Sequence, residues 1–275
     1  MLAISVLRRK KIPFFLNADG GFINEDESER KQKIKRRFIS AATWWLSTAP
    51  QTSKYLMAYG ADEKRIFEYP FSSVKRVDAL SEALTTEERL LVRGRKVLRC
   101  ETLFISVGQF VPRKGYYEFL TQWVSKDRGT IGLAIIGGGV EEALYKEITK
   151  DYPNVWILPF LKKQVLADYF KAADAFVLPT KEDIWGLVVN EAMSFGLPVF
   201  STTSCIAAEK LKGSGVQVFP VGDNDALISA MEYFAMSENR DEMISDVVER
   251  GREYTIEKMA QAHIEIFKDV LKGNG

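Results

Sequence analysis

The sequence is poor in the residues that build metal sites, disulfide frameworks and membrane spans. Only two cysteines and one histidine occur in 275 residues. Cys100 and Cys205 stand in no metal-ligand or disulfide spacing, so we interpret both as inert thiols of a reducing compartment. No run approaches the roughly 18 apolar residues of a membrane span, and the opening stretch, residues 1–7, is too short for a signal peptide. These absences predict a soluble, cytoplasmic protein.

The chain also lacks an excess of either charge. Its 38 basic and 37 acidic residues nearly cancel, which gives no reason to expect a nucleic-acid partner. Basic residues do cluster locally, in the run Arg8, Arg9, Lys10 and Lys11 and in RKQKIKRRF at residues 30–38. These clusters fit peripheral contact with the inner face of an anionic membrane, at about 1 kcal/mol per residue, or the solvated faces of ordinary helices.

Apolar residues are plentiful, at 46% of the chain, and they fall into short runs. From residue 103 onward, strand-like runs alternate with helical patterns. The expected strands are 103–108, 133–138, 155–160, 175–180, 198–203 and 216–221, and the helices between them are 114–125, 140–150, 162–173 and 185–196. Continuous apolar strands with helical connections form a parallel sheet covered on both faces. The pattern predicts an α/β, Rossmann-like domain that binds ligands at the carboxyl ends of its strands.

The residues before 95 repeat this pattern incompletely. We expect strands within 12–22, 43–50 and 65–71, helices at 27–40 and 50–59, a charged connector at 85–96, and amphipathic helices at 223–236 and 255–271. The domains predicted are a partial first lobe, 1–95, a complete Rossmann-like lobe, 96–252, and a terminal helix, 253–275, that returns toward the first lobe. Trp44 and Trp45 fit core packing better than acceptor binding, and His263 fits an ordinary helix position.

The stretch KEDIWGLVVNEAMSFGLPVF, residues 181–200, places two acids around an apolar segment. Asp183 precedes a helix expected to begin near Gly186, and Glu191 lies about one and a half turns inside that helix. The unpaired amides of the first turn can hold a phosphate, and carboxylates accept pairs of hydrogen bonds from vicinal hydroxyls. The alternative is that the acids only complement the positive end of the helix dipole.

EDIWGLVVNEAMSFGLPV resembles the acidic signature of family-4 glycosyltransferases, which have the GT-B fold of two Rossmann-like lobes. NADGGF and the segment from WWLSTAP to RIFEYPF resemble the later half of the first lobe in family members of the capsular or exopolysaccharide type. The resemblance implies that Glu191 binds the ribose of a nucleotide sugar. It implies that Asp183 binds hydroxyls of the donor sugar, although the family usually has glutamate there and Glu182 is the neighbouring substitute. The backbone of Gly186, Leu187 and Val188 would hold the diphosphate.

A second segment, SVGQFVPRKGYYEFL, resembles the strand, loop and helix in which the family sets an arginine and a lysine against the diphosphate. Lys114 matches the lysine, and Gly108 ends the strand. The arginine position holds Gln109, and whether the adjacent Arg113 replaces it stays open. A fixed cation suits this place because transfer leaves a nucleoside diphosphate with growing negative charge. By resemblance the catalytic candidates are Lys114, Asp183 and Glu191.

Weaker matches complete the expected donor site. The glycines at 137–139 follow the second strand of the lobe, so Gly138 and Gly139 would lie near the donor, or they form only a turn. Phe160 and Leu161 would flank the base. The resemblance implies transfer with retention, no metal or other cofactor, and Asp183 and Glu191 as binding groups rather than an acid/base pair.

The function implied is transfer of a sugar, from a donor expected to be UDP-linked, to a bacterial surface polysaccharide or a lipid-linked glycan. The resemblance also implies that the first half of the amino-terminal lobe, with its glycine-rich loop and histidine, is absent. The chain is then either a glycosyltransferase or a nucleotide-sugar-binding subunit or inactive remnant that needs a partner chain or a second copy. A sugar-nucleotide epimerase of the same fold would need acid/base groups that we do not find.

Overall fold

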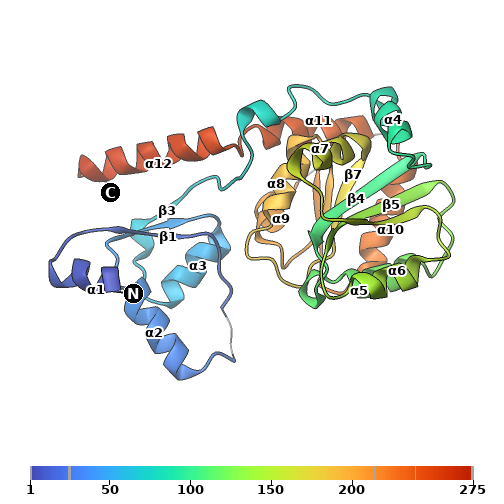
Figure 1. Cartoon of the computed structure of the whole chain (residues 1–275). Helices are drawn as coiled ribbons and strands as arrows, with labels where there is room; N and C mark the ends of the chain where they lie inside the picture. Colours follow the sequence, from blue (N-terminus) through green and yellow to red (C-terminus); the bar gives the residue numbers. More distant parts are fainter. Residues whose placement is uncertain (1, 24–25, 214, 239, 274–275) are drawn as a thin grey trace. The chain divides into compact units, whose positions relative to one another are not determined.

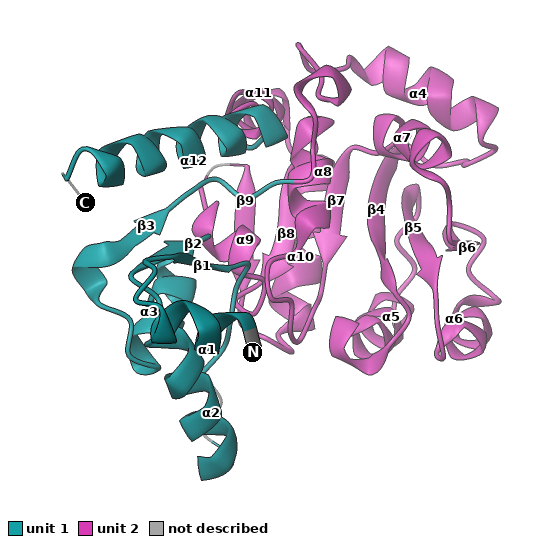
Figure 2. Cartoon of the chain, turned by 60° about the vertical axis from the view of Figure 1, so that its left-hand side comes forward, with its two compact units in different colours: residues 1–72, 254–275 teal, residues 73–253 magenta. Residues whose placement is uncertain are grey.

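The computed structural model describes residues 2–23, 26–213, 215–238 and 240–273 (Figure 1). The chain divides into two compact units, one formed by residues 1–72 with 254–275 and the other by residues 73–253 (Figure 2). The sequence pattern placed a domain boundary near residue 95, whereas the structure groups residues 73–95 with the second unit. None of the described helices combines the length and the apolar character that a bilayer crossing requires.

The second unit is built on a six-stranded parallel sheet. Its strands run in the order β6-β5-β4-β7-β8-β9, with the bounds β4 (Thr102–Gln109), β5 (Ile131–Gly138), β6 (Val155–Pro159), β7 (Ala175–Leu178), β8 (Val199–Thr202) and β9 (Val216–Phe219). The order reverses between β4 and β7, and open α/β sheets bind their ligands at the carboxyl ends of the strands at such a point. The six strands expected from the sequence are confirmed.

Helices cover both faces of this sheet, which explains why its strands are continuously apolar. The helices α5 (Tyr116–Trp123), α6 (Glu142–Thr149) and α10 (Asn224–Met236) lie on one face, and α7 (Lys163–Ala172), α8 (Leu187–Ser194) and α11 (Arg240–Gly251) lie on the other (Figure 1). A short helix, α9 (Ile206–Lys210), follows β8. Phe104 of β4 is fully buried in the core under α5 and α10, where it contacts Trp123, Phe200 and Phe234.

The charge-rich segment that we expected to be a connector is a helix, α4 (Thr86–Arg95), which a capping box begins. Two of its arginines are buried against the carboxyl end of α7. Arg93 donates to the Ala172 carbonyl (3.0 Å) and pairs with Asp174 (2.8 Å), and Arg89 donates to the carbonyl of residue 173. Cations at the end of a helix satisfy its last carbonyls and its dipole. These contacts fix α4 to the second unit.

The first unit contains a three-stranded parallel sheet, β1-β2-β3. Its elements are α1 (Leu2–Arg9), β1 (Phe15–Ala18), α2 (Glu29–Ile39), β2 (Trp44–Ser47), α3 (Pro50–Ala58), β3 (Ile66–Glu68) and α12 (Ile256–Leu271). Trp45 is buried and its indole donates to the Ile39 carbonyl (2.9 Å), so core packing is confirmed for this residue. His263 lies against Tyr69 within the same unit, with ring centroids 4.4 Å apart and the ring planes tilted by 60°. The sequence pattern did not predict α1, α9 or α11.

Candidate functional site

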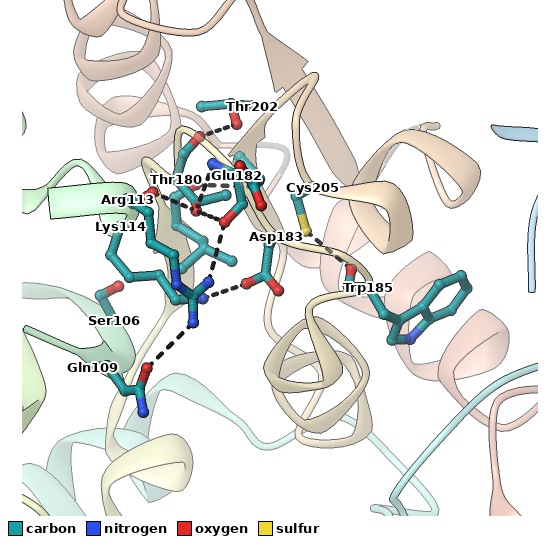
Figure 3. A network of polar contacts seen from close by, with 12 residues as sticks. Ser106, Gln109, Arg113, Lys114, Thr180, Glu182, Asp183, Trp185, Thr202 and Cys205 are labelled. Atoms are coloured by element: carbon teal, nitrogen blue, oxygen red, sulfur yellow. Dashed lines mark hydrogen bonds and ion pairs between the residues drawn. The ribbon is translucent and has the colours of Figure 1, made fainter. Parts of the chain in front are cut away.

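The loops that follow β4 and β7 meet where the strand order reverses. The first loop contains a short 3₁₀ turn at Pro112–Lys114, and the second runs from residue 179 to the start of α8. The amide of Lys181 donates to the Arg113 carbonyl (2.8 Å), and the Thr180 hydroxyl lies 3.1 Å from the same oxygen (Figure 3). The Thr202 hydroxyl, from the end of β8, donates to the Thr180 carbonyl. The two loops therefore form one hydrogen-bonded structure.

Gly115 allows this close approach. Its φ of +69° lies in the left-handed region, and a Cβ built on it would lie 2.2 Å from the Pro179 carbonyl oxygen. A side chain there would push the two loops apart. Lys114, the residue before it, is only 7% exposed, and its Nζ contacts Oδ2 of Asp183. The structure thus brings together two predicted site residues that are 69 positions apart in the sequence.

The loop after β7 leads Asp183 directly into α8. The Asp183 amide donates to the Ser204 carbonyl (2.9 Å), and Gly186 precedes the first helical residue with φ +90°. A Cβ on Gly186 would lie 2.6 Å from Sγ of buried Cys205, so only glycine fits between α8 and the β8–α9 loop. The first-turn amides of α8, at Leu187 and Val188, have no intrahelical acceptor and carry the positive end of the helix dipole. This geometry suits an anion beside Lys114.

Glu191 has a different environment, further along α8. Its Oε1 accepts a hydrogen bond from the Ser73 hydroxyl (3.2 Å), and the side chain borders a cavity of 650 Å³ within the second unit. Burial raises the pKa of Glu191, while the Ser73 hydrogen bond and the charge of Lys163 act in the opposite direction. Lys163 itself pairs with Asp78 at 2.6 Å. Burial therefore makes ionisation of the Glu191 carboxyl group unfavourable. The carboxylate is available to accept hydrogen bonds from hydroxyl groups.

The side chains of Gln109 and Arg113 are exposed beside the pair formed by Lys114 and Asp183. One guanidinium nitrogen of Arg113 donates to Gln109 Oε1 (3.2 Å) and the other to the Glu182 carbonyl (3.2 Å) (Figure 3). The side chain of Glu182 is exposed, and its main chain accepts the bond. The structure consequently places a second cation at the switch point.

The glycines after β5 have a structural explanation. A Cβ on Gly137 would lie 1.9 Å from the Gly108 carbonyl oxygen, and one on Gly139 would lie 2.5 Å from the Phe110 carbonyl oxygen. These two glycines let the turn press against β4 and its loop. A Cβ on Gly138 would lie 3.9 Å from Oε2 of Glu142, an ordinary contact distance, so Gly138 is the member of this turn that leaves room for a ligand.

Phe160 and Leu161, the predicted base-flanking residues, follow β6. Phe160 is 82% exposed and Leu161 is half-buried, so their apolar surface is available to a flat ligand.

The sequence did not predict Ser73 and Lys163 as site residues, because a serine in a linker and a lysine at a helix start carry no recognisable signal. Among the side chains that the structure describes, no group of three or more His, Cys, Asp or Glu gathers as a metal ion would require.

The family model described as Glycosyl transferases group 1 matches residues 96–253, more than half of the chain, so the chain belongs to this family. A curated relative, an uncharacterized glycosyltransferase of Haemophilus influenzae, is 26% identical over 179 residues, which cover 61% of this chain and 48% of the relative. The chain therefore spans about half the length of this relative.

Solved structures of low sequence identity share the fold. The Anabaena protein Alr3699/HepE, in complex with UDP and glucose, has a TM-score of 0.78 at 12% identity, covering 98% of this chain and 75% of that one. Sucrose-phosphate synthase from Thermosynechococcus elongatus has a TM-score of 0.73 at 18% identity, covering 99% and 72%. The lipopolysaccharide outer core galactosyltransferase WaaB has a TM-score of 0.70 at 15% identity, covering 97% and 71%. The chain has a GT-B-like α/β fold with two Rossmann-like lobes.

Proposed function

We propose that this member of the glycosyl transferases group 1 family transfers a sugar from a nucleotide-sugar donor held in residues 73–253. The observation that supports this most is the convergence of Lys114, Asp183 and the start of α8 at the carboxyl ends of β4 and β7. A cation, a carboxylate and helix-start amides without an intrahelical acceptor, gathered at one switch point, match the phosphates and hydroxyls of such a donor.

The donor that we propose is linked to uridine diphosphate. Support comes from the Anabaena structures of the same fold, which hold UDP and UDP-glucose. The diphosphate would lie on Lys114 and the first-turn amides of α8, and the sugar hydroxyls on Asp183. The ribose would lie on Glu191, whose Oε1 already accepts a hydrogen bond from the Ser73 hydroxyl, and the base against Phe160.

Departure of the nucleoside diphosphate is the step that the site assists. As the bond from the anomeric carbon to the phosphate oxygen breaks, negative charge grows on the diphosphate, and the fixed cation and amide dipoles stabilise it. No metal or other cofactor is needed for this. Asp183 is engaged with Lys114, which suits a binding group better than a free base. We therefore propose the family-4 mechanism, in which configuration is retained and the departing phosphate accepts the acceptor's proton.

The acceptor that we propose is a growing surface polysaccharide or a lipid-linked glycan at the membrane. In the first unit the two basic clusters come together, since Arg8 of α1 and Arg37 of α2 line one depression of 190 Å³. Exposed Val6 and Ile34 lie among these basic residues. Basic and apolar side chains together fit peripheral contact with anionic lipid. We therefore propose that the reaction takes place at the cytoplasmic face of a membrane.

Product analysis tests the proposal. The chain is incubated with UDP-, GDP- and ADP-glucose, UDP-galactose and a lipid-linked glycan, and the new linkage is read from the anomeric NMR signals. Transfer from a UDP sugar with retention is expected, and Lys114→Ala should abolish it. Transfer only from a GDP or ADP sugar, or an inverted product, would contradict the donor or the mechanism.

The second candidate is donor binding without transfer by this chain alone. It is favoured by one observation: the aligned region covers only about half of the curated relative. Under this alternative UDP binds and no product forms until a partner chain, or additional polypeptide, is supplied. Transfer by the purified chain would contradict it.

A further inference from the structure

The charge of Lys114 is already compensated. Its Nζ contacts the carboxylate of Asp183, and both side chains are largely buried, at 8% and 14% exposed. A paired lysine and aspartate present little net charge to an incoming ligand. A diphosphate carries at least two negative charges, so the switch point needs a cation that no carboxylate neutralises.

Arg113 is that cation. Its guanidinium donates to the Gln109 side-chain oxygen and to the Glu182 carbonyl, and both acceptors are neutral. No carboxylate of the described residues lies within ion-pair distance of its guanidinium. The side chain is exposed, and a guanidinium has five N–H donors, of which two are used here. The remaining donors match phosphate oxygens in the paired geometry that arginine favours.

The hydrogen bonds of Arg113 are not needed to join the two loops. The Thr180 hydroxyl and the amides of Lys181 and Glu182 already bond to the Arg113 carbonyl, and these contacts do not involve the guanidinium. The hydrogen bond from Arg113 to Gln109 instead holds the guanidinium over the end of β4, next to Lys114 (Figure 3).

We propose that Arg113 supplies the uncompensated positive charge for the donor diphosphate and that Gln109 is its positioning residue. The proposal rests on the proposed function. It assigns the phosphate-binding arginine to a position four residues beyond the end of β4, where a neutral amide side chain directs it. Arg113 and Gln109 are then one functional unit, and their side chains should be exchangeable between the two positions.

Calorimetric titration with UDP, and ligand-observed NMR titration with uridine, test this on the full chain. Arg113→Gln should weaken UDP binding about 10- to 100-fold, the loss typical of a charged hydrogen bond, and leave uridine binding within about twofold. Gln109→Ala should give a smaller loss. The exchange variant Gln109→Arg with Arg113→Gln should recover most of the UDP affinity, because it restores one guanidinium at the same place.

Arg99→Gln is the matched control, since Arg99 is an exposed arginine before the amino end of β4, at the opposite edge of the sheet. Its UDP affinity should equal that of the wild type. If Arg113→Gln binds UDP as tightly as the control while Lys114→Ala does not, the guanidinium is only structural and the proposal is wrong. Equal losses for uridine and UDP would also overturn it, because the loop would then be disturbed. A folded wild type that binds no UDP would refute the proposed function itself.

Discussion

Replacement of Gly186 by alanine tests the geometry at the start of α8. The glycine has φ +90°, and an added Cβ would lie 2.6 Å from Sγ of Cys205. The left-handed backbone costs an alanine roughly 1–2 kcal/mol, and overpacking against a buried atom adds about 1–3 kcal/mol. Gly186→Ala should therefore lower the free energy of unfolding by about 2–5 kcal/mol in total.

The chain offers a matched control for the backbone part of this cost. Gly222 has a similar φ, +85°, and nothing lies within 4 Å of the position of its Cβ. Gly222→Ala should cost only the roughly 1–2 kcal/mol of left-handed strain, and the change in unfolded-state entropy is the same for both substitutions.

Urea unfolding of a double-mutant cycle separates the two parts. Cys205→Ala removes the sulfur that the new Cβ meets, so the double variant should recover the overpacking part and show a coupling energy of about 1–3 kcal/mol. If Gly186→Ala costs no more than Gly222→Ala, or if Cys205→Ala recovers nothing, the packing of α8 described here is wrong.

Three further predictions concern buried charge. Burial raises the pKa of Glu191 above its ordinary value of 4.5. Ionisation of this carboxyl group therefore lowers the free energy of unfolding at a pH above the raised pKa and has no effect at a pH below 4.5. Glu191→Gln should then stabilise the protein at pH 7 and not at pH 4 in thermal unfolding, and an equal effect at both pH values would contradict the assignment. Ser73→Ala removes the hydrogen bond that favours the charged form, so it should raise the pKa of Glu191 further, as followed by carboxyl NMR; an unchanged or lower pKa would refute this. Asp174→Ala leaves Arg93 buried without its partner and should cost about 3–5 kcal/mol in urea unfolding; a cost below about 1 kcal/mol would show that the pair is not buried in solution.

The strands and most helices of the second unit were predictable because their pattern is local. Runs such as 103–108 and 133–138 are apolar throughout, as strands with both faces covered must be. Helix α4 was not predicted because a segment so rich in charged residues is typical of a solvent-exposed connector. In the structure, however, Arg89 and Arg93 are buried against the end of α7. The carbonyls at the end of α7 that accept from them lie about eighty positions away in the sequence, and a local pattern cannot show such partners.

The candidate site was predictable in its residue types and not in its pairings. The sequence indicated that Lys114 and Asp183 follow strands, and strand ends gather at one edge of a parallel sheet. That the two side chains contact each other depends on strand order, which places β7 beside β4. Arg113 instead donates to two neutral acceptors, Gln109 of its own loop and the Glu182 carbonyl of the loop after β7.

Calorimetric titration of the purified chain with UDP and UDP-glucose tests the central claim, that residues 73–253 hold a nucleotide-sugar donor. The wild type should bind both ligands, and Lys114→Ala and Glu191→Ala should each weaken binding about tenfold or more. Lys212→Ala, which removes an exposed lysine before the amino end of β9, should bind as the wild type does. Absence of binding by folded wild-type protein, or equal affinities for all four proteins, would contradict the donor site.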